Sequence, residues 1–185
     1  MPLNTSIIKE IIILIMGPVF QVLAYFILLK IMPDQIESIK LYHYSILIFN
    51  LLPVYPLDGG KLVNLFFSLK FSFKNSFYLE ILISYLMVFL LVIVNRENIN
   101  INLLIIVIFL LYKITKEYKQ IELFYNKFLL ERYINKYNFK HSIIINNINK
   151  FHRNKRHLLK TANKYYLEEE ILKKIYKNRW HIKNC

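Results

Sequence analysis

Long apolar runs separated by short polar stretches dominate the first 112 residues. One run covers residues 7–32, with an uncharged core at 11–29, and another covers residues 77–94. A shorter run lies at residues 99–112. A helix needs ~20 apolar residues to span a bilayer, so the first two runs predict membrane-spanning helices and the third is marginal.

The apolar run at residues 44–52 is too short to span a membrane and ends at a proline. Two prolines and two glycines interrupt the chain between residues 53 and 60, before a further apolar stretch at residues 62–69. Proline removes a backbone donor and breaks a helix, which a membrane tolerates only against protein or a cavity. We therefore predict a discontinuous or re-entrant element, of the kind that marks binding sites in membrane proteins.

Helical spacing continues beyond the last apolar run. Apolar positions predict one amphipathic helix that continues from residues 99–112 and a second helix at residues 165–176, while residues 33–44 are expected to form a loop. The fold class predicted is all-α: a polytopic helical membrane protein with about four membrane elements and a basic helical tail. The positions that indicate the first tail helix are Ile114, Tyr118, Ile121, Tyr125 and Phe128.

Charge divides the chain into two parts. Residues 1–112 carry seven Lys/Arg and six Asp/Glu, a net charge of +1, whereas residues 113–185 carry eighteen and six, a net charge of +12. We therefore predict a membrane core at 1–112 and a basic tail at 113–185, whose densest basic patch lies at residues 151–157. The positive-inside rule predicts a cytoplasmic tail and, by alternation, both termini in the cytoplasm.

Composition supports the membrane interpretation. The 185 residues are 56% hydrophobic and 16% aromatic, with a mean hydropathy of +0.34, more apolar than an ordinary soluble domain requires. The single cysteine, Cys185, excludes a disulfide framework or a cysteine-based zinc site within one chain.

The broken segment at residues 50–60 reads Asn-Leu-Leu-Pro-Val-Tyr-Pro-Leu-Asp-Gly-Gly. Polar and charged groups at membrane depth are costly unless they are paired or functional, so this segment is the candidate site. Glu80, in contrast, is expected to lie near the membrane interface beside Lys74.

Residues 44–62 resemble the third conserved motif and its flanks in the site-2 protease family of intramembrane zinc metalloproteases (peptidase M50). The likeness is closest to the branch of stage IV sporulation protein FB. Gly17-Pro18 resembles the Gly-Pro pair on the membrane helix that precedes this motif, and residues 128–133 resemble a segment after the last membrane helix of that branch.

The resemblance implies that Asp58 is the third zinc ligand. A buried carboxylate needs a cation, and a metal ion is an effective neutraliser, so the physical argument agrees. Gly59 and Gly60 would allow close backbone approach, and Asn50 would hold a substrate segment or its carbonyl. The residues expected either to shape the substrate cleft or to have a structural role, such as a proline kink in a spanning helix, are Asn50, Pro53, Pro56, Gly59, Gly60, Gly17, Pro18 and Gln21.

The family's other two ligands and its general base come from a His-Glu-x-x-His motif, which this sequence does not contain. No catalytic residue is therefore assigned, and zinc is expected only if such a segment is supplied. Two interpretations remain open. The chain is the C-terminal part of an intramembrane metalloprotease whose start was lost or misassigned, or it is an inactive relative that acts as a membrane scaffold or substrate-binding protein.

A complete enzyme of this family would cleave membrane-associated proteins, and the sporulation branch implies removal of a sigma-factor pro-segment. The expected location is a bacterial cell membrane. Expected partners are membrane lipids, a membrane-associated substrate and membrane regulatory proteins. The basic tail favours anchoring on anionic lipid, with substrate or regulator docking as the alternative. Nucleic-acid binding is not expected, since no aromatic platform or DNA-reading motif accompanies the charge.

Overall fold

The computed structural model describes residues 3–98, 100–135, 137, 139, 141–161 and 164–183, with the side chains of 98 and 177–183 left aside. The single cysteine lies outside the described residues. Along the chain the elements are α1 (Ile7–Ile31), η1 (Pro33–Gln35), α2 (Ile36–Leu51), α3 (Asp58–Lys70), α4 (Phe73–Val94), η2 (Arg96–Asn98), α5 (Ile101–Asn135), β1 (Ser142–Ile145), η3 (Ile148–Lys150), β2 (Arg156–Thr161), β3 (Lys164–Leu167) and α6 (Glu168–Lys183).

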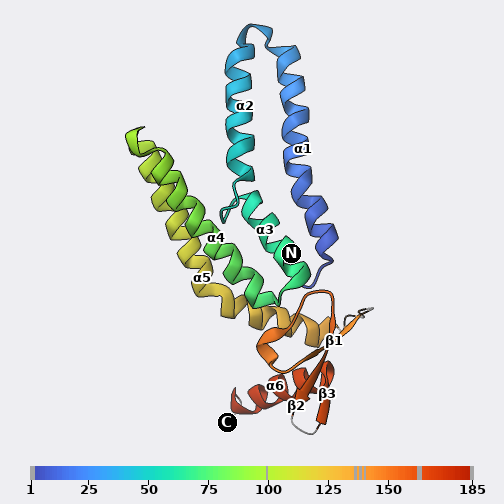
Figure 1. Ribbon diagram of the computed structural model, residues 1–185. Helices are drawn as coiled ribbons and strands as arrows, with labels where there is room; N and C mark the ends of the chain where they lie inside the picture. Colours follow the sequence, from blue (N-terminus) through green and yellow to red (C-terminus); the bar gives the residue numbers. More distant parts are fainter. Residues whose placement is uncertain are drawn as a thin grey trace.

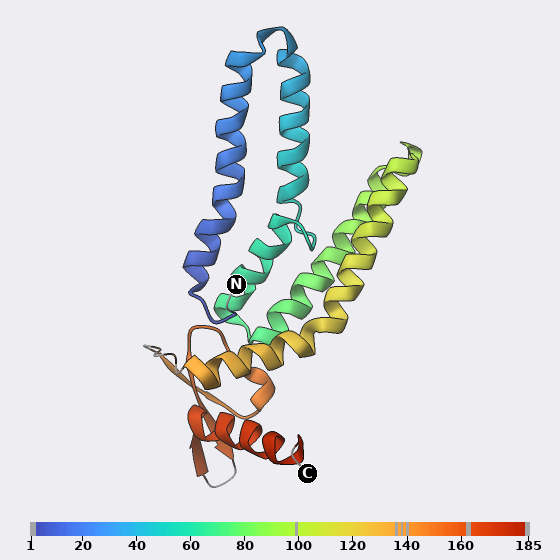
Figure 2. The same ribbon diagram turned by 180° about the vertical axis from the view of Figure 1, so that it is seen from behind.

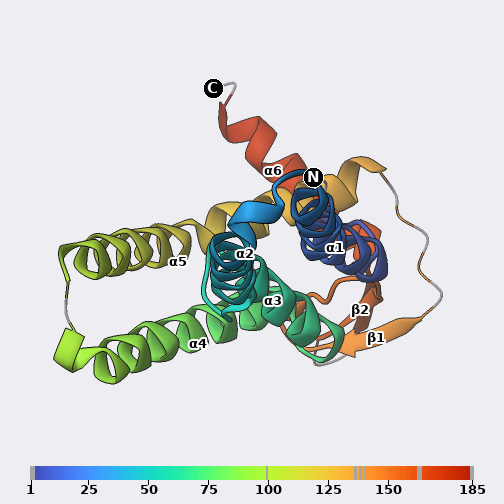
Figure 3. The ribbon, with the colours of Figure 1, turned by 90° about the horizontal axis from the view of Figure 1, so that it is seen from above.

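Two helical hairpins diverge from a common base (Figure 1). The first hairpin is α1 and α2, and the second is α4 and the first half of α5. The short helix α3 lies between them at the base and contacts α1, α2 and α4. The view from above shows the second hairpin extending away from the first (Figure 3). The predicted break after residue 52 is confirmed, because α2 ends at Leu51 and α3 begins at Asp58.

The helix α1 exposes apolar side chains around most of its circumference. Among its residues only Ile7 is buried, and such a helix suits a lipid environment rather than water. Within the described part of the chain, α1 and α4 are long and apolar enough to cross a membrane, each with a mean hydropathy of 2.5. The helices α2 and α5 do not meet that criterion, so four membrane elements remain a prediction.

The strands β1, β2 and β3 and the helix α6 form a C-terminal unit, and this unit corrects the all-α prediction. It contains a three-stranded sheet in the order β1-β2-β3, in which β1 and β2 are parallel and β2 and β3 are antiparallel. The helix expected at residues 165–176 begins only at Glu168, because Tyr165 pairs with Lys160 in the sheet. The sheet and α6 lie below the helical hairpins, next to the end of α5 (Figure 2).

Other boundaries also differ from the sequence prediction. The loop expected at residues 33–44 is mostly helix, since α2 begins at Ile36. The amphipathic tail helix is confirmed as the continuation of α5, which runs without a break through the proposed domain boundary at residue 112. That division into two domains remains a prediction.

Two buried clusters hold these parts together. The first cluster joins α4, α5 and the turn before α3, and includes Val54, Ile81 and Ile114. The second cluster joins the start of α4, the end of α5 and the C-terminal unit, and includes Phe73 and Phe151. The backbone N–H of Phe73 also donates to the carbonyl of Phe151 at 2.8 Å. The C-terminal unit is therefore packed against the helical base.

Candidate functional site

Asp58 is the first residue of α3, directly after the proline-containing turn. The helix dipole favours a carboxylate at this position, because the first backbone N–H groups of a helix are unpaired. Its side chain is 34% exposed, and its Oδ1 atom lies 3.6 Å from the Nζ atom of Lys61. This long ion pair on a partly open carboxylate leaves oxygen atoms that a further cation can approach.

Gly59 and Gly60 allow α3 to begin directly against the end of α2. A β-carbon on Gly59 would overlap the carbonyl oxygens of Leu51 and Leu52. A β-carbon on Gly60 would lie 2.6 Å from the backbone nitrogen of Tyr55. The close backbone approach expected at these glycines is therefore found, and it is an approach to the chain's own backbone.

The helix α1 brings its own predicted site residues to this turn. A β-carbon on Gly17 would lie 3.7 Å from Oδ2 of Asp58, an ordinary contact distance. Pro18 lies inside α1 without ending it. Gln21 lies one turn later and donates from Nε2 to the backbone carbonyl of His43 at 3.1 Å, which ties α1 to α2. Asn50, Pro53 and Pro56 are half-buried around the same turn.

A buried polar network runs behind the turn. The Nδ2 atom of Asn64 on α3 donates to Oε2 of Glu80 on α4 at 2.8 Å, and Glu80 is only 2% exposed. Ser84, one turn after Glu80, accepts from the backbone N–H of Tyr55 at 2.9 Å. The side chain of Glu80 is thus enclosed between helices, and its expected place near the membrane interface stays a prediction. The sequence contains a signal for this network, because Asn64 and Glu80 are polar residues within otherwise apolar runs.

A cavity of about 420 Å³ lies beside this network. Its polar lining includes Glu80 and Lys61, together with Glu117 from α5, which is 6% exposed. Glu10 and Arg153 line the same space, so three carboxylates, one lysine and one arginine face it, close to the turn that carries Asp58. Among the residues that the structure describes, no group of three His, Cys, Asp or Glu side chains is placed to hold a metal ion.

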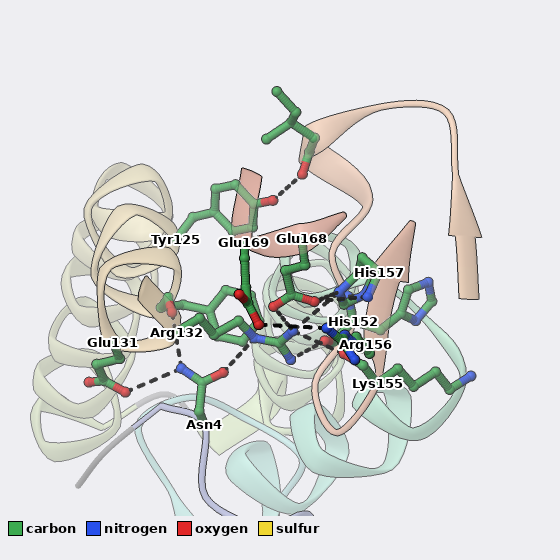
Figure 4. A network of polar contacts seen from close by, with 12 residues as sticks. Asn4, Tyr125, Glu131, Arg132, His152, Lys155, Arg156, His157, Glu168 and Glu169 are labelled. Carbon is green, nitrogen blue, oxygen red and sulfur yellow. Dashed lines mark hydrogen bonds and ion pairs between the residues drawn. The ribbon is translucent and has the colours of Figure 1, made fainter. Parts of the chain in front are cut away.

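A second polar centre lies at the junction of α5 and the C-terminal unit (Figure 4). The guanidinium of Arg132, whose side chain is 1% exposed, donates to Glu168 Oε1 at 2.8 Å and to Asn4 Oδ1 at 2.7 Å. Arg132 belongs to residues 128–133, the segment noted above for its family likeness. Sequence reasoning gave this segment no role, because its partners lie up to 128 positions away.

Part of the chain is similar to a curated protein. It is 36% identical over 102 residues to stage IV sporulation protein FB of Bacillus subtilis (strain 168). The match supports a relation to the family of that protein. The aligned region covers 54% of this chain and 35% of the relative, so the chain spans about a third of the relative's length. No protein-family model matches the chain.

The match and the two long apolar helices together indicate a membrane protein related to that sporulation family. Catalytic zinc sites use three protein ligands and keep one position for water. Among the described residues no such set of ligands surrounds Asp58, so we derive no hydrolytic step for this chain alone.

Proposed function

We propose that this chain forms the Asp-ligand part of an intramembrane zinc metalloprotease that cleaves membrane-associated proteins. Asp58 would supply one zinc ligand, and a His-Glu-x-x-His segment absent from this sequence would supply two more ligands and the general base. The observation that carries the proposal is the partly open Asp58 carboxylate, placed at the break between two helices and next to Gly17.

The surroundings of Asp58 support this role. Gly59 and Gly60 hold the start of α3 tightly against the preceding turn, so the carboxylate has a defined position. Asn50 and the two prolines lie around the same turn, where they would contact an unwound substrate segment. The resemblance to the sporulation branch implies that the substrate is the pro-segment of a sporulation sigma factor. The proposed location is the bacterial cell membrane, with both termini cytoplasmic.

A zinc measurement tests this proposal. The chain is co-purified with a membrane helix that carries His-Glu-x-x-His, and the zinc content and the cleavage of a membrane-tethered substrate are measured. The wild-type complex should hold about one zinc per protein, and Asp58→Asn should lose both zinc and cleavage. Asp34→Asn is the matched control, because Asp34 is an exposed aspartate in η1. Equal zinc content in the Asp58 variant and the control would overturn the ligand role.

A second candidate function has one specific observation in its favour. The ammonium of Lys61 lies 3.6 Å from Asp58 and can neutralise it without a metal ion. The chain would then be an inactive relative that binds substrates or acts as a membrane scaffold. Lys61→Met separates the two functions. A metalloprotease should keep its zinc in this variant, whereas a scaffold should bind no zinc in either form.

A further inference from the structure

The C-terminal half of the chain holds the N-terminal segment, residues 3–10, at several points. The backbone N–H of Leu3 donates to Glu131 Oε2 at 2.7 Å, and Asn4 Nδ2 donates to the carbonyl of Phe128 at 3.0 Å. Asn4 Oδ1 accepts from Arg132 Nε, as described above. In the first turn of α1, Glu10 forms an ion pair with Arg153, whose side chain is 5% exposed. These contacts fix where α1 begins.

The short segment at residues 152–155 supports both anchors. Arg132 Nη2 donates to the carbonyl of His152 at 2.7 Å, and Nη1 donates to the carbonyl of Lys155 at 2.9 Å. Arg153, the partner of Glu10, follows His152 directly in the chain. A movement of residues 152–153 would therefore disturb the Arg132–Asn4 contact and the Arg153–Glu10 pair together.

His157 holds this segment through its ring. The residue is 0% exposed, and its Nε2 atom accepts from the backbone N–H of His152 at 2.8 Å. Its Nδ1 atom lies 2.9 Å from Oε2 of Glu168. Because Nε2 is an acceptor, the network assigns the proton of the neutral ring to Nδ1, which donates to Glu168.

A second proton on this ring would have no acceptor. It would sit on Nε2 and point at the N–H of His152, so that hydrogen bond would be lost. Burial lowers the pKa of His157, and the nearby charge of Arg132 acts in the same direction, against the opposing hydrogen bond to Glu168. The charged and titratable groups around the ring are Arg132 from α5, Glu168 from α6, and His152 and Lys155 from the connecting segment.

We propose that His157 is a proton-sensitive lock for the N-terminal segment. The neutral ring holds residues 152–155 in place, and the charged ring releases Asn4 and Glu10 from the C-terminal unit. Because α1 also carries Gly17 against Asp58, release changes the packing at the proline turn. The lock is a property of the fold and does not depend on the proposed protease function.

Distance measurements between two spin labels test this lock. The labels are placed at Lys9 on α1 and Lys160 on β2, both exposed, in a Cys185→Ser background of the full chain in lipid nanodiscs. One narrow distance distribution is expected at pH 8, with a second, longer population at pH 5. Because the charged ring favours the open state, the open-to-closed ratio should rise as the pH falls from 8 to 5, by at most about tenfold for each pH unit.

Two histidine variants provide the comparison. His157→Gln keeps an amide oxygen that can accept from His152 but cannot become charged, so its distances should not respond to pH. His141→Gln replaces an exposed histidine beside β1 and should respond as the wild type does. A wild type without a pH response, or a His157→Gln variant that retains it, would overturn the lock.

Imidazole nitrogen NMR on the wild type tests the role of His157 even if the His157→Gln variant does not fold. The expected spectrum at pH 8 shows His157 with its proton on Nδ1, and the ring should become charged over the same pH range in which the distance changes. A proton on Nε2, or a ring that stays neutral while the distance lengthens, would overturn the proposal.

Discussion

The charged groups of the Asp58 turn and of the Arg132 centre differ in how deeply they are buried and in how many partners they have. Asp58 is one-third exposed and has a single cation at 3.6 Å. Arg132 is almost fully enclosed and donates to a carboxylate, an amide oxygen and two backbone carbonyls. A buried charge with all its partners stabilises one arrangement, whereas an exposed and loosely paired one can exchange its partner for a ligand. The Arg132 centre therefore fits a structural role, and the Asp58 turn fits binding.

The largest effect is expected at Arg132. Arg132→Met leaves Glu168 buried without its guanidinium, and breaking a buried ion pair in this way costs about 3–5 kcal/mol. Denaturant unfolding of the purified chain measures the loss. Arg156→Met is the control, because the Arg156 side chain is 44% exposed and lies 3.6 Å from Glu169, so its removal should cost less than about 1 kcal/mol. Similar losses in both variants would contradict the distinction.

The glycines of the Asp58 turn should rank next. Gly60→Ala places a methyl group 2.6 Å from the backbone nitrogen of Tyr55, and overpacking of this kind costs about 1–3 kcal/mol. Gly17→Ala meets its nearest atom at 3.7 Å and should be neutral or stabilising by up to about 1 kcal/mol, because alanine favours a helix. Unfolding in mixed detergent micelles compares the two variants. A destabilised Gly17→Ala together with a neutral Gly60→Ala would show that the turn is packed differently.

A smaller effect, dependent on pH, is expected at His157. Its pKa in the folded chain lies below the unfolded value of about 6.5, so the unfolded chain takes up the proton first as the pH falls. The stability is therefore complete above about pH 6.5 and declines below it by up to about 1.4 kcal/mol per pH unit, until the folded pKa is reached. Unfolding of the wild type and His157→Gln between pH 8 and pH 5 measures this slope, which should be shallower in the variant.

Glu168 adds to this slope only at lower pH. Burial acts to raise the pKa of Glu168, but the hydrogen bond from His157 and the charge of Arg132 outweigh it and hold the pKa below its ordinary value. Its contribution is present above the unfolded value of about 4.3 and is lost as the pH falls through the folded pKa. A stability profile that stays flat from pH 6.5 to pH 3 would contradict both assignments.

The smallest effect on stability is expected at Lys61. Its ion pair with Asp58 is long and half-exposed, and such pairs contribute about 0–1 kcal/mol. Lys61→Met should therefore unfold with the wild type to within about 0.5 kcal/mol. A loss comparable with that of Arg132→Met would mean that Asp58 depends on lysine as a structural partner, which would favour the scaffold function.

Residues close together in the chain determined the helices of the apolar runs and the break between residues 53 and 60, where the candidate site lies. The apolar runs are long enough to impose helices on their own, and the prolines and glycines between residues 53 and 60 stop one helix before the next. The approach of Gly59 and Gly60 to neighbouring backbone also follows from short-range steric limits. These features depend on residues close together in the chain, and this is why the sequence alone predicted them.

Only the tertiary structure decided the sheet, the enclosed Glu80 and the Arg132 centre. Strand pairing and burial depend on which distant segments meet, and helical spacing cannot distinguish a helix at residues 165–176 from a strand followed by a helix. Leu3 and Glu131 are 128 positions apart, yet they share a hydrogen bond. Asp58 could be found from its neighbours in the chain, whereas Arg132 acquires its role from partners that only folding brings to it.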